Sequence, residues 1–418
     1  MYSSLINWIQ RQVWRENPDP DPPAIPPLPF LPTPPSSSEN VTTKDVATIV
    51  PTPNNGIFFE RLPSDLRRII LIEAFGDRVV HMDLRYDRPL LAGNPRSTLH
   101  AGGINISNPY NRQTEKPHAW QWYSCICHRD PEWCVRGHLS ARAEDLTSTP
   151  VKDSCLRGRF QSCHGLLGDS GDMSMCFLGV MGWLMTCRQA YFEGFDILYS
   201  TNRFHISGMP LIEHLPRLLP TKALSDIESV EMEWNLGMVA RPPLTDQDIS
   251  ADERFHGWRM FLSLLNQLPK SLPRLRYLHI TLRGTWFPPQ MAPNDRIRLS
   301  EPAMLQPMDE MMRNLYRESE WSTPRYIVAI PASVFRARMS VDDSTLEDGQ
   351  EDIIEPLHER RLVWRSLESE MVGQLRSNSG IGYWLEEGIE DVNNLVHEQS
   401  SIWRVRTISV QPLLAGDW

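Results

Sequence analysis

The residues best suited to bind a metal ion are concentrated in one stretch of the chain, "SCICHRDPEWCVRGH" together with "CLRGRFQSCHG". Zinc is held by four thiol, imidazole or carboxylate ligands and can order a loop that has no hydrophobic core of its own. The candidate zinc ligands here are Cys125, Cys127, His128, Cys134, Cys155 and Cys163. Their Cys-x-Cys spacing differs from the Cys-x-x-Cys of the common zinc fingers, so free thiols are the alternative interpretation.

Catalytic motifs are missing from the sequence. It contains no GxSxG nucleophile elbow, no Walker phosphate loop, no HExxH zinc motif and no GxGxxG between a strand and a helix. The Ser, His and Asp of "HGLLGDSGD" are explained by ordinary loop composition. The sequence therefore predicts a protein that is not an enzyme, with zinc as the one cofactor that its residues suggest.

Composition and charge favour an intracellular protein. The 418 residues carry a net charge of −10, which argues against nucleic-acid binding because phosphate contacts need clustered Lys and Arg. No run approaches the roughly 20 apolar residues that a membrane span requires, and the N-terminus lacks the pattern of a secretory signal. The seven cysteines are therefore expected to be reduced, in the cytoplasm or the nucleus.

Composition also divides the chain into regions. Residues 1–55 contain the proline-rich run "NPDPDPPAIPPLPFLPTPP" and predict a disordered tail. Residues 56–335 predict a folded domain, interrupted at 88–172 by a loop-like, Cys-rich insertion. Residues 336–418 predict an acidic surface loop followed by a segment that packs on the body.

Two amphipathic helices are expected on either side of the insertion. In "RLPSDLRRIILIEAF", Pro63 suits the first helical turn, where a missing N–H group is tolerated. The apolar residues that follow the spacing of one buried helix face are Leu62, Leu66, Ile69 and Ile70. Arg67 and Arg68 are then expected on the opposite, solvated face. The second helix is predicted from Gly182, through "GWLMTCRQAYFEGFDILYSTN".

Strand and helix patterns alternate in the rest of the domain. Strands are predicted in "RVVHMDLRY", "RFHI", "IESVEMEW", "LRYLHITL" and "RYIVAIP". Helices are predicted in "MPLIEHLPRLL", "ERFHGWRMFLSLLNQL" and "AMLQPMDEMMRNLY". This alternation predicts an α/β fold of βα units with a mainly parallel, open sheet.

The two helical stretches resemble the paired motifs of a known family. "LPSDLRRIIL" resembles an LPxELRxxIY opening, and "LMTCRQAYFEGFDILYSTNRFHI" resembles an LLxTCRxxYxEAxxxLYxxNxFxF block. Together they resemble a fungal F-box-like family whose domain has no assigned function, over roughly residues 57–335. The chain departs from the motifs mildly, with Asp65 in place of Glu and Gly194 in place of Ala.

The resemblance implies a protein–protein interaction role, as a substrate receptor for a ubiquitin ligase or as a scaffold. The residues that would contact a Skp1-type adaptor are Leu62, Pro63, Leu66 and Ile70. An apolar helix face can also be part of a hydrophobic core, which is the competing interpretation of the same residues. A further alternative is a binding module stabilised by zinc in the Cys/His-rich insertion.

Overall fold

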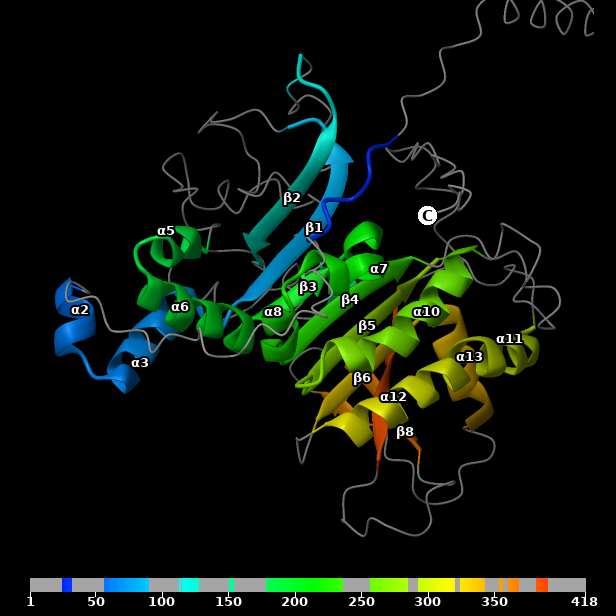
Figure 1. Ribbon diagram of the computed structural model, residues 1–418. Helices are drawn as coiled ribbons and strands as arrows, with labels where there is room; N and C mark the ends of the chain where they lie inside the picture. The colour runs from blue at the N-terminus through cyan, green and yellow to red at the C-terminus, as the bar shows by residue number, and fades with distance from the viewer. Residues whose placement is uncertain are drawn as a thin grey trace, which may run out of the picture.

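The computed structural model describes twelve stretches of the chain (Figure 1). They are residues 25–31, 56–89, 113, 115–127, 150–153, 178–235, 256–284, 292–319, 324–342, 353–355, 360–367 and 381–389. Within these stretches, no helix is long and apolar enough to cross a membrane.

The described strands form one sheet in the order β2-β1-β3-β4-β5-β6-β9-β8-β7. The six central strands are parallel, namely β1, β3, β4, β5, β6 and β9. Antiparallel pairings add β2 at one end of the sheet and β8 and β7 at the other. The strands are β1 (Val79–Asp87), β2 (Ala119–Ile126), β3 (Arg203–Ile206), β4 (Ser229–Asn235), β5 (Tyr277–Arg283), β6 (Arg325–Ile330), β7 (Ile353–Glu355), β8 (Arg360–Ser366) and β9 (Gly382–Glu387). The predicted α/β fold with a mainly parallel sheet is confirmed.

Helices connect the parallel strands. The connections contain α5 (Val180–Leu184), α6 (Arg188–Thr201), α7 (Met209–Leu218), α8 (Thr221–Asp226), α10 (His256–Ser271), α11 (Pro293–Ser300), the π-helical turn η7 (Glu301–Leu305), α12 (Gln306–Glu318) and α13 (Ala332–Asp342). Because β3, β4, β5 and β6 are neighbours in chain order, right-handed crossovers place successive helices on the same face of the sheet. Figure 1 shows α7, α10 and α12 side by side across that face.

The hydrophobic core lies between these helices and the sheet. Alternate residues of the strands point into it, such as Val230 in β4 and Leu278 in β5, and they meet Phe261 and Leu265 of α10. The residues between them point to the opposite face of the sheet, which we call the second face. The crossover helices thus pack on the apolar side chains of one face of the sheet, and a separate set of side chains lies on the second face.

A smaller helical unit lies at the β1 end of the sheet. It consists of α2 (Gly56–Arg61), α3 (Ser64–Phe75), α5 and α6, which join around a satellite core of Leu71, Phe75, Val180 and Ile197. Asn202 connects the ends of α3 and α6, because its amide donates to the carbonyls of Phe75 and Leu198 at 2.9 and 3.0 Å. The two stretches that flank the insertion in the sequence therefore form one packed unit.

Part of the proline-rich tail packs on the body. Residues 25–31 form no helix or strand, and Leu28 and Phe30 contact the main core. The Arg217 guanidinium lies 3.5 Å from the centre of the Phe30 ring, and Trp120 donates to the carbonyl of Pro26 at 2.9 Å. The prediction of disorder for residues 1–55 is wrong for this segment, because its few apolar side chains find contacts that the proline content did not reveal.

Both predicted irregular regions contain regular structure. The insertion at 88–172 was expected to be loop-like, yet β2 and the 3₁₀ turn η4 (Pro150–Lys152) lie within it. In the C-terminal region 336–418, which was expected to be an acidic loop and a segment packed on the body, β7, β8 and β9 extend the sheet. Trp364 and Trp384 belong to β8 and β9 and meet edge-to-face at 5.0 Å, whereas Trp403 lies outside the described residues.

Candidate functional site

The side of helix α3 that faces the protein interior is the opposite of the one that the sequence predicts. Arg67 is 8% exposed and points inward, where its guanidinium forms a two-pronged ion pair with Glu193 of α6 at 2.7 and 3.0 Å. Its remaining nitrogen donates to the Leu62 carbonyl at 2.5 Å. A buried guanidinium is stable when its donors are satisfied in this way. The ion pair therefore fixes Arg67 and, with it, the rotation of α3.

The same ion pair perturbs the pKa values of both partners. The hydrogen bond to Glu193 raises the pKa of Arg67 above its usual range. Burial would raise the pKa of Glu193, but the hydrogen bonds from Arg67 and Gln189 outweigh it and lower that pKa. Both groups are therefore charged around neutral pH, and the pair locks α3 against α6.

This orientation turns the apolar residues of α3 toward solvent. Leu66, Ile69 and Ile70 are 48%, 62% and 44% exposed, and we call these three residues the α3 surface. The core-facing residues of the helix are Leu71 and Phe75, at 2% and 4%. The prediction that Leu66, Ile69 and Ile70 form a buried face is wrong, because an inward arginine displaces them.

The predicted partner-binding residues can now be placed. Leu66 and Ile70 belong to the α3 surface, Pro63 is exposed immediately before the helix, and Leu62 is half-buried beside it. The rest of the helical unit also exposes large apolar side chains, namely Met181, Met185, Tyr191 and Phe192. Exposed apolar residues concentrated on one unit are typical of a protein-binding surface.

Gly194 has a packing role in this unit. A Cβ atom at Gly194 would lie 2.7 Å from a carbon of the Trp183 indole, which is too close for van der Waals contact. The glycine thus allows Trp183 to approach α6. Cys187 is the N-cap of α6, and its Sγ accepts a hydrogen bond from the Ala190 N–H at 3.4 Å.

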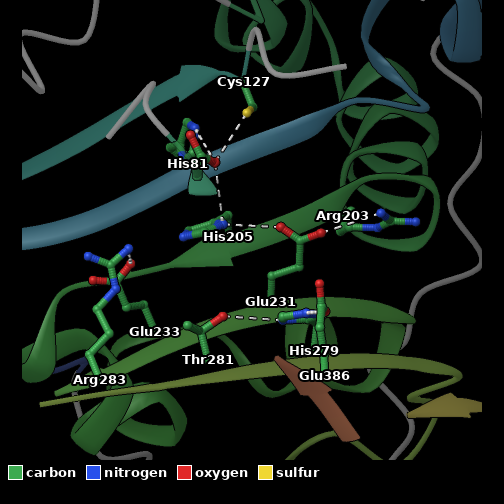
Figure 2. Close-up of polar contacts among 11 residues, drawn as sticks. His81, Cys127, Arg203, His205, Glu231, Glu233, His279, Thr281, Arg283 and Glu386 are labelled. Carbon is green, nitrogen blue, oxygen red and sulfur yellow. Dashed lines mark hydrogen bonds and ion pairs between the residues drawn. The ribbon is translucent and has the colours of Figure 1, made fainter. Parts of the chain in front are cut away.

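A second candidate site lies on the second face of the sheet. His81, His205, Glu231 and His279 are paired across β1, β3, β4 and β5 in one register, so their side chains lie on the same face. All four are at most 1% exposed. Figure 2 shows this polar rung crossing the sheet. Ionisable side chains in such a line are expensive to bury unless each one is paired.

Hydrogen bonds and ion pairs join the members of the rung. His205 Nδ1 lies 3.1 Å from Glu231 Oε2, and Arg203 donates to the other oxygen of Glu231 at 3.3 Å. His279 Nε2 lies 2.7 Å from a carboxylate oxygen of Glu386 in β9. Burial lowers the pKa of His205 to about 4, although its hydrogen bond to Glu231 acts in the opposite direction. The His205 ring is therefore neutral at pH 7.

The polar rung meets the inserted segments at its β1 end. Asp153, directly after η4, is fully buried, and its Oδ2 lies 3.6 Å from His81 Nε2 and 3.8 Å from His205 Nδ1. Cys127, directly after β2, places its Sγ 3.5 Å from the same oxygen. Nitrogen and sulfur donors from three separate segments thus converge around one carboxylate.

The predicted zinc ligands divide between described and undescribed residues. Cys125 and Cys127 are buried, at 2% and 3% exposure, with Cys125 opposite His81 in the β1–β2 pairing. His128, Cys134, Cys155 and Cys163 lie outside the described residues. Of the predicted set, the structure therefore places Cys127 beside a cluster of other metal-binding groups.

Sequence reasoning missed the polar rung. The available signal was a His or Glu between apolar neighbours in successive predicted strands, as in "VVHMD", "FHI", "VEM" and "LHI". Alternation alone indicates a strand with two different faces. It does not give the register that places these residues side by side.

The fold and the two sites define a protein with a mainly parallel sheet, the helices α7, α10 and α12 on one face, a buried polar rung on the second face and a helical unit that exposes apolar residues. Residues 135–327, just under half of the chain, match the family model described as a domain of unknown function (DUF7730). The matched range contains α6, Asp153, His205, Glu231 and His279 and ends within β6. No curated protein and no solved structure matches the chain.

Proposed function

We propose that the protein is a non-enzymatic interaction protein whose helical unit binds a protein partner through the α3 surface. The observation that carries this proposal is the outward orientation of Leu66, Ile69 and Ile70 on a helix that is already anchored from its other side. A hydrophobic helix face of this kind is suited to a groove on a partner. A core role for the three residues is disfavoured because Leu71 and Phe75 already supply the core contacts.

We propose a Skp1-type adaptor as the partner, which would make the protein a substrate receptor of a ubiquitin ligase. The support is the resemblance of "LPSDLRRIIL" to the opening of F-box-like proteins, together with the exposure of Pro63, Leu66 and Ile70. The sheet would then act as the rigid body that presents a client to the ligase.

The test is co-purification of the full chain with the adaptor. Leu66→Asp combined with Ile70→Asp is expected to weaken binding by about 100-fold, since each side chain at a desolvated interface contributes on the order of 1.4 kcal/mol or more, or tenfold in affinity. The same variant is expected to keep its fold, because both side chains are exposed.

Trp122→Asp is the matched control, because Trp122 is a similarly exposed apolar residue, at 47%, on the edge strand β2. It is expected to bind the adaptor as the wild type does. The proposal fails if a folded wild-type chain forms no complex, or if the control and the α3 variant lose binding equally.

A further inference from the structure

The two histidines around Asp153 are spaced as metal ligands, whereas the thiol of Cys127 hydrogen-bonds to the Asp153 carboxylate at 3.5 Å. One ligand atom each of His81, Asp153 and His205 can be chosen so that all three lie within 4.8 Å of one another. The nitrogen–oxygen distances of 3.6 and 3.8 Å exceed the roughly 2.7–3.2 Å of an N–H···O hydrogen bond. The two imidazoles and the carboxylate converge without hydrogen bonds to one another, and Cys127 lies just outside this group of three.

Zinc geometry accounts for these separations. Two nitrogen or oxygen ligands at about 2.0–2.1 Å from a tetrahedral zinc ion lie about 3.3–3.4 Å apart, and a thiolate at about 2.3 Å lies about 3.5 Å from a carboxylate oxygen. The distance from Cys127 Sγ to Asp153 Oδ2 is 3.5 Å. The two nitrogen–oxygen distances exceed the ideal by a few tenths of an ångström. Because His205 Nδ1 also contacts Glu231 at 3.1 Å, zinc would displace that hydrogen bond when it binds this nitrogen.

A second histidine–carboxylate pair on the same face provides an internal comparison. His279 and Glu386 are equally buried, but their nitrogen and oxygen atoms lie 2.7 Å apart. That is the length of a direct hydrogen bond, and it leaves no space for an ion between the two groups. The wider spacing around Asp153 is therefore a local property of this cluster and not of histidine–carboxylate pairs in this sheet.

We propose that His81, Asp153 and His205, joined by Cys127 when its thiol turns from Asp153 toward the ion, form a structural zinc site that fastens the insertion to the second face of the sheet. Two imidazoles, a carboxylate and a thiolate are a ligand set that suits Zn²⁺ in charge as well as in chemistry. With one carboxylate and one thiolate, the site would carry no net charge, which suits burial in a medium of low dielectric constant. This proposal does not depend on adaptor binding.

The ligand positions explain what such an ion would do for the fold. His81 and His205 lie on adjacent parallel strands, while Cys127 and Asp153 lie at the two ends of residues 128–152 within the insertion. A zinc ion would therefore close this excursion of the chain and hold both of its ends on the sheet. Closure of a long loop by a metal stabilises the folded state because it restricts the unfolded chain.

The experiment is metal analysis of the full-length chain purified without chelator. We expect about one zinc ion per chain. Asp153→Asn and His205→Gln are each expected to lower zinc affinity by at least about tenfold. His279→Gln, the matched control on the same rung, is expected to retain the full zinc content.

Two further measurements keep the test decisive if a ligand variant does not fold. In the cobalt-substituted wild type, we expect a thiolate-to-metal charge-transfer band that disappears in Cys127→Ser while the visible d–d bands remain. Chelation of the wild type is expected to lower its unfolding temperature, and added zinc is expected to restore it.

Three results would overturn the proposal. One is a wild-type chain that holds no stoichiometric metal and binds neither Zn²⁺ nor Co²⁺. Another is a bound metal that remains at full occupancy in Asp153→Asn and His205→Gln. The third is metal that is lost when Cys134, Cys155 and Cys163 are replaced by Ser, because that loss would locate the site in the other cysteines of the insertion.

Discussion

Replacing Arg67 tests the rotation of α3, on which the α3 surface depends. Arg67→Met removes the charge-assisted hydrogen bonds to Glu193 and the hydrogen bonds to the Phe59 and Leu62 carbonyls. The two side chains are only 10% and 27% exposed, so Glu193 is left partly desolvated without its cation. We expect the free energy of unfolding to fall by about 2–3 kcal/mol.

The neighbouring residue supplies a matched control. Arg68 pairs with Asp196 of α6 at 2.8 Å, but these side chains are 50% and 44% exposed. Solvent screening limits such a pair, and Arg68→Met is expected to cost at most about 0.5 kcal/mol. The two variants thus remove the same side chain from consecutive positions of one helix, and they differ mainly in burial.

The assay is urea unfolding followed by tryptophan fluorescence at several pH values. The pKa of Glu193 is lowered in the folded state, so its stabilising effect is present above the ordinary value of 4.5 and is lost as the pH falls through the folded pKa. The difference between wild type and Arg67→Met should therefore shrink below about pH 4.5. Equal losses in the two variants, or no loss in Arg67→Met, would refute the inward position of Arg67.

Three further predictions follow from burial and charge. Leu71→Ala should destabilise the protein by about 2–5 kcal/mol, whereas Ile70→Ala should cost less than about 1 kcal/mol, because these adjacent residues are 2% and 44% exposed; equal losses in urea unfolding would contradict this. Burial raises the pKa of Glu213 to about 7, so the wild type should lose stability as the pH rises from about 4.5 to 7. Glu213→Gln should therefore be more stable than the wild type by about 1–2 kcal/mol at pH 8 but not at pH 4, and a stability difference that is independent of pH would exclude this explanation. Phe30→Ala removes the ring on which Arg217 stacks and should lower stability by about 1 kcal/mol in thermal unfolding, while an unchanged transition would mean that residues 25–31 do not hold their position in solution.

The sheet was predictable from the sequence because each parallel strand alternates with a helix of clear 3.6-residue periodicity. In "SVEMEW" and "YLHITLR", the alternation of side chains between two faces identifies a strand even if its ends are misplaced by a residue or two. Short helices were not predicted, and α8 and α11 begin after Pro220 and at Pro293, where composition alone indicates a turn. The strands of the C-terminal region were missed because the acidic stretch that contains β7 shows no alternation, although β7 pairs with β8 only a few residues farther along the chain.

The orientation of α3 was not predictable for a specific physical reason. Hydrophobic periodicity assigns the buried face to Leu66 and Ile70, and it assigns Arg67 to solvent. The residue that reverses this assignment, Glu193, is 126 positions away. Sequence patterns within one helix cannot include a tertiary ion pair of this kind.

The candidate zinc site was only partly foreseen. Cys127 was predicted as a zinc ligand because cysteine near histidine is typical of zinc sites. His81, Asp153 and His205 were not considered, since each is isolated in the sequence and surrounded by apolar or loop residues. They become neighbours only through the β1–β3 register and the return of the insertion at η4.

The most direct test of adaptor binding through α3 is hydrogen–deuterium exchange across Ser64–Phe75 in the full chain, with and without the Skp1-type adaptor. We expect a stoichiometric complex in which backbone amides of α3 exchange more slowly than in the free protein, while the exchange rates of amides in β4 and β5 are unchanged. A complex that leaves α3 exchange unaltered would contradict the account, and so would a folded chain that forms no complex.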